Sequence, residues 1–283
     1  MAQEPLVWRG KGVEWEVRRT LVMGILNVTP DSFSDGGQHF AMRAAVERGL
    51  RIAEEGADLL DIGGESTRPR SQPVPAEEEW RRIGSVIPAI RRKSAIPISV
   101  DTRKPEVARK AIEAGAAFVN DVMGLRDPAM AKLVAETGVG AVVMHMQGEP
   151  ATMQADPHYE DVVGEVRAFL SRQLESAVAM GVPREAIVLD PGIGFGKTAA
   201  HNRELLRGLP HIRSLGRPVL VGVSRKSMLA EFHPQEDRRR LEASLAATAV
   251  ALQGGADIVR VHDIAETVRF IRAFGALSGR GNL

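Results

Sequence analysis

A glycine placed between a helical segment and a short apolar run recurs along this chain, and no other feature constrains its fold as strongly. Copies of this unit begin at Glu55, Ala114, Thr137 and Gly254. In each copy the glycine supplies the left-handed residue that ends a helix, and the apolar run is typical of a strand buried on both faces. The repeat therefore predicts a parallel architecture of alternating strands and helices.

Eight strands are predicted, with a helical stretch after each one. They lie near residues 21–26, 58–63, 96–101, 117–121, 140–145, 187–190, 219–224 and 257–262. Two of the helical stretches, 162–178 and 263–276, carry apolar residues at a period of 3.6. Eight strands that alternate with helices favour a (β/α)8 TIM barrel over a doubly wound sheet, and 283 residues is an ordinary length for such a barrel.

The amino-terminal residues follow a different pattern from the rest of the chain. Residues 6–8 and 13–17 flank a glycine-rich turn, which predicts a β-hairpin that caps one end of the barrel. No linker divides the sequence, and the proline-rich stretch 68–75 is expected to be a loop after the second strand. We therefore expect one domain over 1–283, with the hairpin in 1–19 and the barrel in 20–283.

Composition excludes several classes of function. The formal net charge is +1, from 37 basic and 36 acidic residues, without the basic excess of a nucleic-acid binder. The absence of cysteine excludes disulfides, thiolate metal sites and thiol nucleophiles. No apolar run approaches the roughly 18 residues of a membrane span, and the first residues do not resemble a signal peptide. We expect a cytoplasmic protein that binds neither nucleic acid nor membrane.

Polar residues stand at the carboxyl ends of the predicted strands, where the active site of a TIM barrel lies. The residues assigned to this site by their position are Asn27, Asp101, Asn120, Asp190, Lys226 and Arg260. Buried polar groups cost free energy unless they are paired, so polar ends on all eight strands predict an enzyme.

Helix capping is the alternative explanation for some of these polar residues. A cap of the following helix is the favoured interpretation for Asp121, Asp127 and Asp263. Thr102 is expected to cap the helix after the third strand, which leaves Asp101 free to point inward. His145 is either a packed core histidine or a site residue, and the sequence leaves both interpretations open. Met144 and Met146 are more often packing residues than ligand contacts.

A glycine-rich stretch at residues 192–198 resembles phosphate-binding loops but does not match them. A P-loop needs glycine where Pro191 stands, and a dinucleotide fingerprint needs glycine where Lys197 stands. We interpret the stretch as a flexible loop that closes on a ligand, with Phe195 as an apolar lid.

Charge divides the predicted site into two halves. A cationic rim that suits a phosphate-bearing substrate is formed by Arg68, Arg225, Lys226, Arg260 and His262. A deeper group that suits a planar heterocycle with adjacent N–H donors is formed by Asp101, Asn120 and Asp190. No cluster has the spacing of an all-protein metal site, so the expected metal is Mg²⁺ held mainly by phosphate oxygens.

Five motifs at the strand ends strongly resemble those of the dihydropteroate synthases. They are residues 25–37, 61–69, 144–148, 190–197 and 224–227, in the right order along the chain from about Thr20 to the last helix. One position departs from the family pattern, because Arg70 stands where the family usually has glycine after the Thr-Arg-Pro of the second loop.

The resemblance implies a TIM-barrel enzyme of folate biosynthesis. Such an enzyme condenses (7,8-dihydropterin-6-yl)methyl diphosphate with 4-aminobenzoate to give 7,8-dihydropteroate and diphosphate, with Mg²⁺ as cofactor. It also implies a homodimer formed through the last helices, and loops 28–40 and 64–76 that close over both substrates. An SN1-like cleavage of the C–O bond, without a covalent enzyme intermediate, is the expected path.

The resemblance also implies a role for each matching residue. The pterin ring would be held by Asp101, Asn120, Asp190 and Lys226. Arg260 would stack on the ring and reach the diphosphate, and Asn27 would contact Mg²⁺. Diphosphate oxygens would be bound by Thr67, Arg68 and His262. The aminobenzoate pocket would be shaped by Phe33, Pro69, Phe195 and Ser224. Further substrate contacts are expected at Met144 and Gly222, and the catalytic residues would be Asp101, Asp190, Lys226 and Arg260.

Two alternatives were weighed against this interpretation. A pterin-binding methyltransferase that passes a methyl group from methyltetrahydrofolate to a corrinoid would share Asp101, Asn120 and Asp190. It would not need the loop 29–37 or the motif 224–227, whose presence argues against it. A barrel that only binds a partner would show eroded strand ends, and none is eroded.

Overall fold

Eight parallel strands form one sheet that curls into a barrel in the computed structural model, which describes residues 6–29, 37–66, 71–233 and 239–279. The strands are β3 (Leu21–Asn27), β4 (Leu59–Gly63), β5 (Ile98–Asp101), β6 (Phe118–Asp121), β7 (Gly140–Met144), β8 (Ile187–Asp190), β9 (Leu220–Val221) and β10 (Ile258–Val261). Their order is β8-β7-β6-β5-β4-β3-β10-β9, and a parallel bridge between Leu189 and Val219 joins the two edges. The predicted TIM barrel and all eight strands are confirmed, although the seventh strand is only two residues long.

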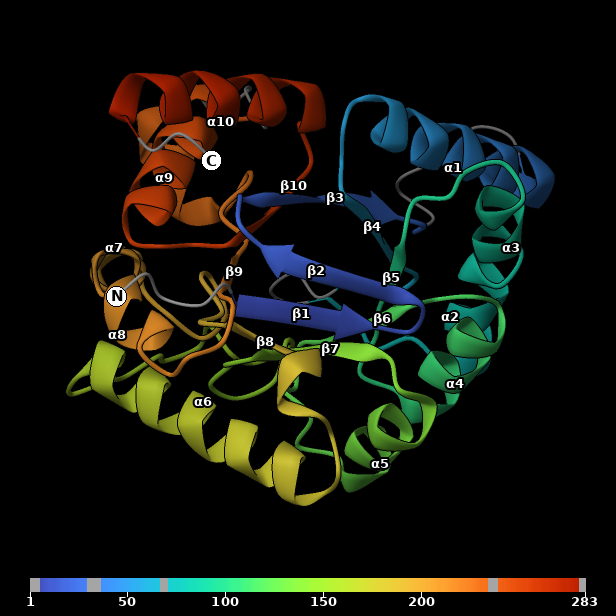
Figure 1. Cartoon of the computed structure of the whole chain (residues 1–283), viewed down its shortest axis with the longest axis horizontal. Helices are drawn as coiled ribbons and strands as arrows, with labels where there is room; N and C mark the ends of the chain where they lie inside the picture. Colours follow the sequence, from blue (N-terminus) through green and yellow to red (C-terminus); the bar gives the residue numbers. More distant parts are fainter. Residues whose placement is uncertain (1–5, 30–36, 67–70, 234–238, 280–283) are drawn as a thin grey trace.

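Helices surround the strands on the outside of the barrel (Figure 1). They are α1 (Gly37–Glu54), α2 (Ala76–Ile83), α3 (Val86–Arg91), α4 (Pro105–Glu113), α5 (Pro128–Thr137), α6 (Val162–Ala179), α7 (Ala199–Arg207), α8 (Leu209–Arg213), α9 (Leu241–Gln253) and α10 (Ile264–Ser278), with short 3-10 turns η2 (Arg184–Ala186) and η3 (Ser227–Phe232). The two helices predicted from periodicity are confirmed as α6 and α10. None of the helices in the described ranges is long and apolar enough to cross a membrane.

The glycines of the repeated unit take the backbone conformation that the sequence predicts. Gly56, Gly115, Gly138 and Gly255 have φ values of 99°, 108°, 67° and 90°. Side chains disfavour this left-handed region, so glycine ends the helix there and lets the chain turn into the next strand at little cost.

Side chains along the barrel strands alternate between the helices and the barrel interior. The inward residues near the amino ends of the strands are apolar and form one cluster: Leu21, Met23, Leu59, Phe118, Val142, Val188, Leu220 and Ile258. Two residues further along their strands, the same inward face carries Asp61, Asn120, Asp190 and Arg260. The interior therefore consists of an apolar layer at one end and a polar layer at the other.

The amino-terminal hairpin packs against the apolar layer. It consists of β1 (Leu6–Gly10) and β2 (Val13–Val17), and it lies across the ring of strands (Figure 1). Trp8 is fully buried with its ring centroid 4.4 Å from that of Phe118, and Trp15 stacks on the same ring at 5.3 Å. The buried Arg217 donates to the carbonyl oxygens of Val7 and Ile187 and ties the hairpin to β8. The prediction that the hairpin caps one end of the barrel is confirmed.

Replacement of Trp8 by alanine tests whether the hairpin holds the barrel together. We expect Trp8→Ala to lower the free energy of unfolding by about 3–5 kcal/mol, because it opens a cavity under the apolar layer. Urea unfolding followed by circular dichroism measures this loss. Lys132→Ala serves as the control, because that side chain on α5 is 73% exposed and its loss should change stability by less than about 0.5 kcal/mol. Equal stability of the two variants would show that the hairpin is dispensable.

Candidate active site

The polar layer brings together side chains from five strands at the carboxyl end of the barrel. Strand pairing sets Asp101 beside Gly63 on one side and beside Asn120 on the other, and it sets Asp190 beside Met144. Asp101, Asn120 and Asp190 are buried. The structure thus brings together the residues that the sequence assigned to the heterocycle-binding half of the site.

Arg260 links two carboxylates across this layer. Its Nε donates to Oδ2 of Asp61 at 2.6 Å, and its Nη2 donates to Oδ2 of Asp101 at 2.5 Å. The same oxygen of Asp61 also accepts from Nδ2 of Asn120 at 2.9 Å. The guanidinium therefore supplies one positive charge that two buried acids share, and it holds them at a fixed spacing.

Asp61 is the residue of this cluster that sequence reasoning missed. It lies inside β4 rather than after it, and its carboxylate is fully buried. The alternation of side chains could have identified it, because Asp61 stands two residues after Leu59 and so shares its inward face.

Two carboxylate oxygens of the polar layer have no partner among the described residues. They are Oδ1 of Asp61 and Oδ1 of Asp101, and both are buried. Leaving a buried acceptor unpaired costs about 1–3 kcal/mol, more when it is charged. Acceptors held in this way mark a place where a ligand with N–H donors can bind.

Burial shifts the pKa values of the titratable groups in this layer. It raises the pKa values of Asp101 and Asp190, even though Gly192 donates its backbone N–H to Asp190 at 2.7 Å. Burial lowers the pKa of Lys226 to about 8, although nearby Asp190 opposes the shift. Burial also acts to lower the pKa of Arg260. The charges of Asp61 and Asp101 have the larger effect, so the pKa of Arg260 is raised overall. One buried layer therefore holds carboxylates and cations whose pKa values depend on burial and on one another.

The rim of the site is formed by the segments that follow β8, β9 and β10. The ring of Phe195 lies 4.1 Å from Nζ of Lys226, a cation–π contact. His262 and Ser224 lie side by side, with 3.1 Å between Nδ1 and Oγ. Gly222 faces Arg260, since a Cβ placed there would lie 3.8 Å from the Cβ of Arg260. The structure thus places these predicted residues in contact with one another, pair by pair, at the carboxyl ends of β8, β9 and β10.

Met144 ends β7 and lies within a small apolar cluster. Its partners in the cluster are Val122, Met146, Met153 and the partly buried Met123 and Phe195. The cluster lines the β7 and β8 side of the site, opposite the ion pairs of Arg260.

Arg225, which the sequence assigned to the cationic rim, is engaged in an ion pair. Its guanidinium donates to Asp263 at 2.6 and 3.1 Å, and Arg239 binds the same carboxylate. Asp263 occupies the position before α10 but caps no backbone N–H, so the capping prediction is wrong there. The carboxylate balances two cations instead, which is a stronger interaction than a single cap.

The other capping predictions have mixed outcomes. Asp127 caps α5 by accepting from the backbone N–H of Ala129, as predicted. Asp121 accepts from the N–H groups of Met123 and Leu125 and closes a turn ahead of that helix. Thr102 is not the cap of α4, because the helix begins later, after Lys104, and Thr102 accepts only from the N–H of Lys104.

His145 belongs to the core beside the site. It is buried with its ring edge-on to Phe169 at 4.9 Å, and its Nδ1 lies 3.0 Å from Nζ of Lys197. Burial and the charge of Lys197 lower the pKa of His145 to about 2, so the ring is neutral. Of the two interpretations left open by the sequence, these contacts favour the packed core histidine.

Asn27 ends β3 next to Gly63 and is the residue expected to contact a metal ion. Its amide supplies one hard oxygen of the kind that Mg²⁺ prefers. No group of three or more His, Cys, Asp or Glu side chains that could hold a metal occurs in the described part of the chain. This donor set fits an ion that takes most of its ligands from a bound substrate. The remaining site residues named from the sequence lie outside the described residues: Phe33, Thr67, Arg68, Pro69 and the divergent Arg70.

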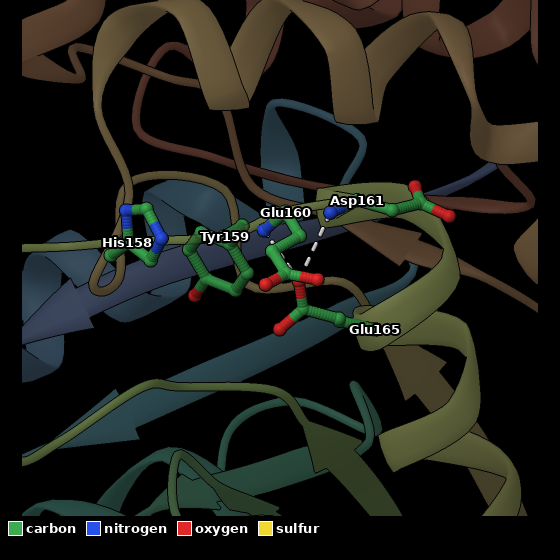
Figure 2. Close-up of a pocket in the computed structure, with 5 residues that line it drawn as sticks. All are labelled: His158, Tyr159, Glu160, Asp161 and Glu165. Carbon is green, nitrogen blue, oxygen red and sulfur yellow. Dashed lines mark hydrogen bonds between the residues drawn. The ribbon is translucent and has the colours of Figure 1, made fainter.

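A hollow of about 340 Å³ lies at the surface next to the start of α6 (Figure 2). Among its lining residues, Glu165 accepts from the backbone N–H groups of Glu160 and Asp161. Asp161 in turn caps α6 by accepting from Gly164. These bonds explain the acidic lining as the start of a helix, so the polar layer of the barrel is the better candidate for an active site.

The family model described as pterin binding enzyme matches residues 23–262. Dihydropteroate synthase from Escherichia coli (strain K12) is 44% identical over 273 residues, which cover 96% of this chain and 97% of that protein. The structure of Xanthomonas albilineans dihydropteroate synthase with 4-aminobenzoic acid has a TM-score of 0.89 and 49% identity, covering 94% of this chain and 96% of that one. The enzyme from the same organism in complex with 7,8-dihydropteroate has a TM-score of 0.85 and 46% identity, covering 94% and 97%.

Removal of the central cation tests the electrostatics of the polar layer. We expect Arg260→Met to lower the free energy of unfolding by about 3–5 kcal/mol at pH 8, because two buried carboxylates lose their counter-charge. Without the guanidinium, the pKa of Asp101, which burial already raises, rises further in the folded state, and a raised carboxyl pKa costs stability as the pH rises through it. The loss should therefore be smaller at pH 5.5 than at pH 8 in urea unfolding.

The matched control is Arg184→Met, which breaks an exposed ion pair with Glu175. We expect it to cost less than about 1 kcal/mol at either pH. If Arg260→Met were as stable as this control at pH 8, the ion pairs of Arg260 would not compensate the buried acids.

Proposed function

The chain belongs to the dihydropteroate synthase family of pterin-binding transferases, and from this premise we propose that it condenses (7,8-dihydropterin-6-yl)methyl diphosphate with 4-aminobenzoate. The products would be 7,8-dihydropteroate and diphosphate, a step of folate biosynthesis. The observation that carries the proposal is the pair of buried, unpaired carboxylate oxygens on Asp61 and Asp101. They suit the adjacent N–H donors of an aminopyrimidine ring, such as the one in a pterin.

The polar layer would hold the pterin ring. We assign its N–H groups to Asp190 and to the unpaired oxygens of Asp61 and Asp101, and its acceptor atoms to Asn120 and Lys226. Arg260 would turn from the bridging position seen in the structure to lie on the face of the ring and reach the diphosphate, which its planar guanidinium allows. A ligand that pairs with Asp101 would compensate the contact that Arg260 gives up.

The rim would bind the diphosphate and 4-aminobenzoate. His262 would bind diphosphate oxygens together with Thr67 and Arg68. The aminobenzoate ring would lie among Phe195, Ser224, Phe33 and Pro69, with Met144 and Gly222 as further substrate contacts. The contact between Phe195 and Lys226 supports this assignment, because it places the apolar ring directly beside the pterin half of the site.

Asn27 would contact the magnesium ion, with diphosphate oxygens and water as the other ligands. The ion, when bound, supplies positive charge that stabilises the leaving diphosphate. Arg260 adds a positive charge of the protein's own at the same place, and a ring N–H of His262 can donate a hydrogen bond to the leaving group.

Bond cleavage in this site follows from its division by charge. The electrons of the C–O bond leave with the diphosphate, and the carboxylates of Asp101 and Asp190 stabilise the positive charge that develops on the pterin methylene. The lone pair of the neutral arylamine then forms the C–N bond, and the amine loses a proton to solvent. This SN1-like path needs neither a strong general base nor a covalent enzyme intermediate.

We also propose that residues 1–283 act as one domain and that two copies pair through their last helices. Exposed apolar side chains on α9 and α10 support the pairing, because Val250 and Leu277 stand on the outer surface of these helices.

A direct assay tests the proposed reaction. Incubation with the pterin diphosphate, Mg²⁺ and labelled 4-aminobenzoate should yield labelled dihydropteroate. Asp190→Asn should lower kcat/KM by roughly 10²-fold, since it removes a charge that opposes the cation in the transition state. Absence of labelled product with the wild-type chain would refute the function. A trapped protein–pterin adduct, or full turnover by Asp190→Asn, would refute the mechanism.

The pH dependence of kcat/KM tests the role of Lys226. Because burial lowers the pKa of Lys226 to about 8, its ammonium form is lost as the pH rises through this value, and kcat/KM should fall there. Burial raises the pKa of Asp101, so kcat/KM should also fall toward acid pH as that carboxylate is protonated. Lys226→Arg should lose the alkaline limb, because a guanidinium does not titrate in this range. An alkaline limb that persists unchanged in this variant would assign it to another group.

A further inference from the structure

We propose that Lys197 is a positioning residue, whose side chain organises the loop after β8 and thereby sets the place of Phe195 and of the Asp190 carboxylate. The kinetic consequences of this inference rest on the proposed function, whereas the organisation of the loop by Lys197 does not. Lys197 is buried although it is a lysine, and burial of this residue type requires specific partners.

The amino group of Lys197 sits at the centre of its own loop. Nζ lies 2.9 Å from the carbonyl oxygen of Gly192, 3.0 Å from that of Phe195 and 3.0 Å from Nδ1 of His145. These three contacts use the full bonding capacity of an ammonium group. The side chain therefore ties both ends of the segment 192–195 to the wall of the barrel.

The two carbonyl groups held by Lys197 belong to residues that shape the active site. Gly192 donates its N–H to Asp190 at 2.7 Å, and its carbonyl oxygen also accepts from the N–H of Phe195 at 3.1 Å. Phe195 in turn places its ring 4.1 Å from Nζ of Lys226. One buried cation thus connects the carboxylate of the pterin half with the aromatic ring of the aminobenzoate half.

The loop after β7 encloses this arrangement. Gln154 donates to the carbonyl oxygen of Gly194 at 2.9 Å, and the hydroxyl group of Tyr159 donates to that of Gly196 at 2.8 Å. The backbones approach so closely that a Cβ on Gly192 would lie 1.8 Å from the carbonyl oxygen of His145. Gln154 and Tyr159 thus bind the carbonyl groups of this segment from the loop after β7, whereas Lys197 binds them from within the loop after β8.

The partners of Lys197 remain paired in either of its protonation states. Burial lowers the pKa of Lys197 to about 7, against the opposing charge of Asp190. The ammonium form donates to both carbonyls and to neutral His145. The amine form keeps two donors and accepts from the other tautomer of His145. The cluster can therefore hold the loop throughout the neutral range.

Lys197→Met tests the proposal, because methionine keeps an apolar chain of similar size but cannot donate. Hydrogen exchange by NMR should show faster exchange of the amides of Gly194 and Phe195, by at least about tenfold. The KM for 4-aminobenzoate should rise by about 10-fold to 100-fold, with a smaller change for the pterin diphosphate. If Lys197→Met does not fold, Lys197→Gln takes its place, since its shorter amide cannot reach all three partners.

Lys132→Met is the matched control, since Lys132 lies on α5 in an exposed pair with Glu136. It should leave exchange of the loop and both KM values unchanged. The proposal would be overturned if the Lys197 variants showed the hydrogen exchange and the KM values of the wild-type chain. It would also be overturned if they lost stability in general while the exchange rates of the loop amides and the ratio of the two KM values stayed unchanged. If the wild-type chain makes no dihydropteroate, the proposed function fails, while exchange still decides whether Lys197 organises the loop.

Discussion

Only every second side chain of a barrel strand can reach the interior, and the rest of this structure depends on that constraint. In this barrel the inward side chains are apolar near the amino ends of the strands and polar near the carboxyl ends. The apolar layer is completed from below by Trp8, so the upper layer is free to be polar. Asp61, Asn120, Asp190 and Arg260 follow the apolar layer at a distance of two residues, which places them in one plane without any long-range adjustment of the loops.

A layer of buried acids is stable only with internal counter-charge. Arg260 provides that charge for Asp61 and Asp101, and Lys226 lies near Asp190 and is also buried. Buried ion pairs of this kind contribute little net stability, because desolvation offsets their attraction. Their value here is geometric, since a bidentate guanidinium fixes the distance between two carboxylates that have no other shared support.

The sequence predicts the fold well because the determinants of the fold are local. The helix-ending role of each glycine in the repeated unit is predicted from its immediate neighbours, and its positive φ is a local property. Polar residues at the carboxyl end of a strand, such as Asp190, are predicted for the same reason. Asp61 is not predicted because it lies in the middle of β4, where only the direction of the side chain distinguishes a site residue from a structural one. The sequence marks Lys197 only as a departure from a nucleotide-binding motif, since its side-chain partner His145 comes from another loop.

The unpaired oxygens of Asp61 and Asp101 connect stability with ligand binding. Each costs the folded chain about 1–3 kcal/mol as long as it lacks a donor. Packing of the apolar layer and the hairpin can offset this free-energy cost, because they lie in a different part of the interior and need no polar partner. A heterocycle that supplies N–H donors removes the cost, so part of its binding energy comes from relief of an existing penalty. The same acceptors are held in place before binding, by Arg260 from one side and by Asn120 from the other, so the site selects for the spacing of the donors as well as for their charge.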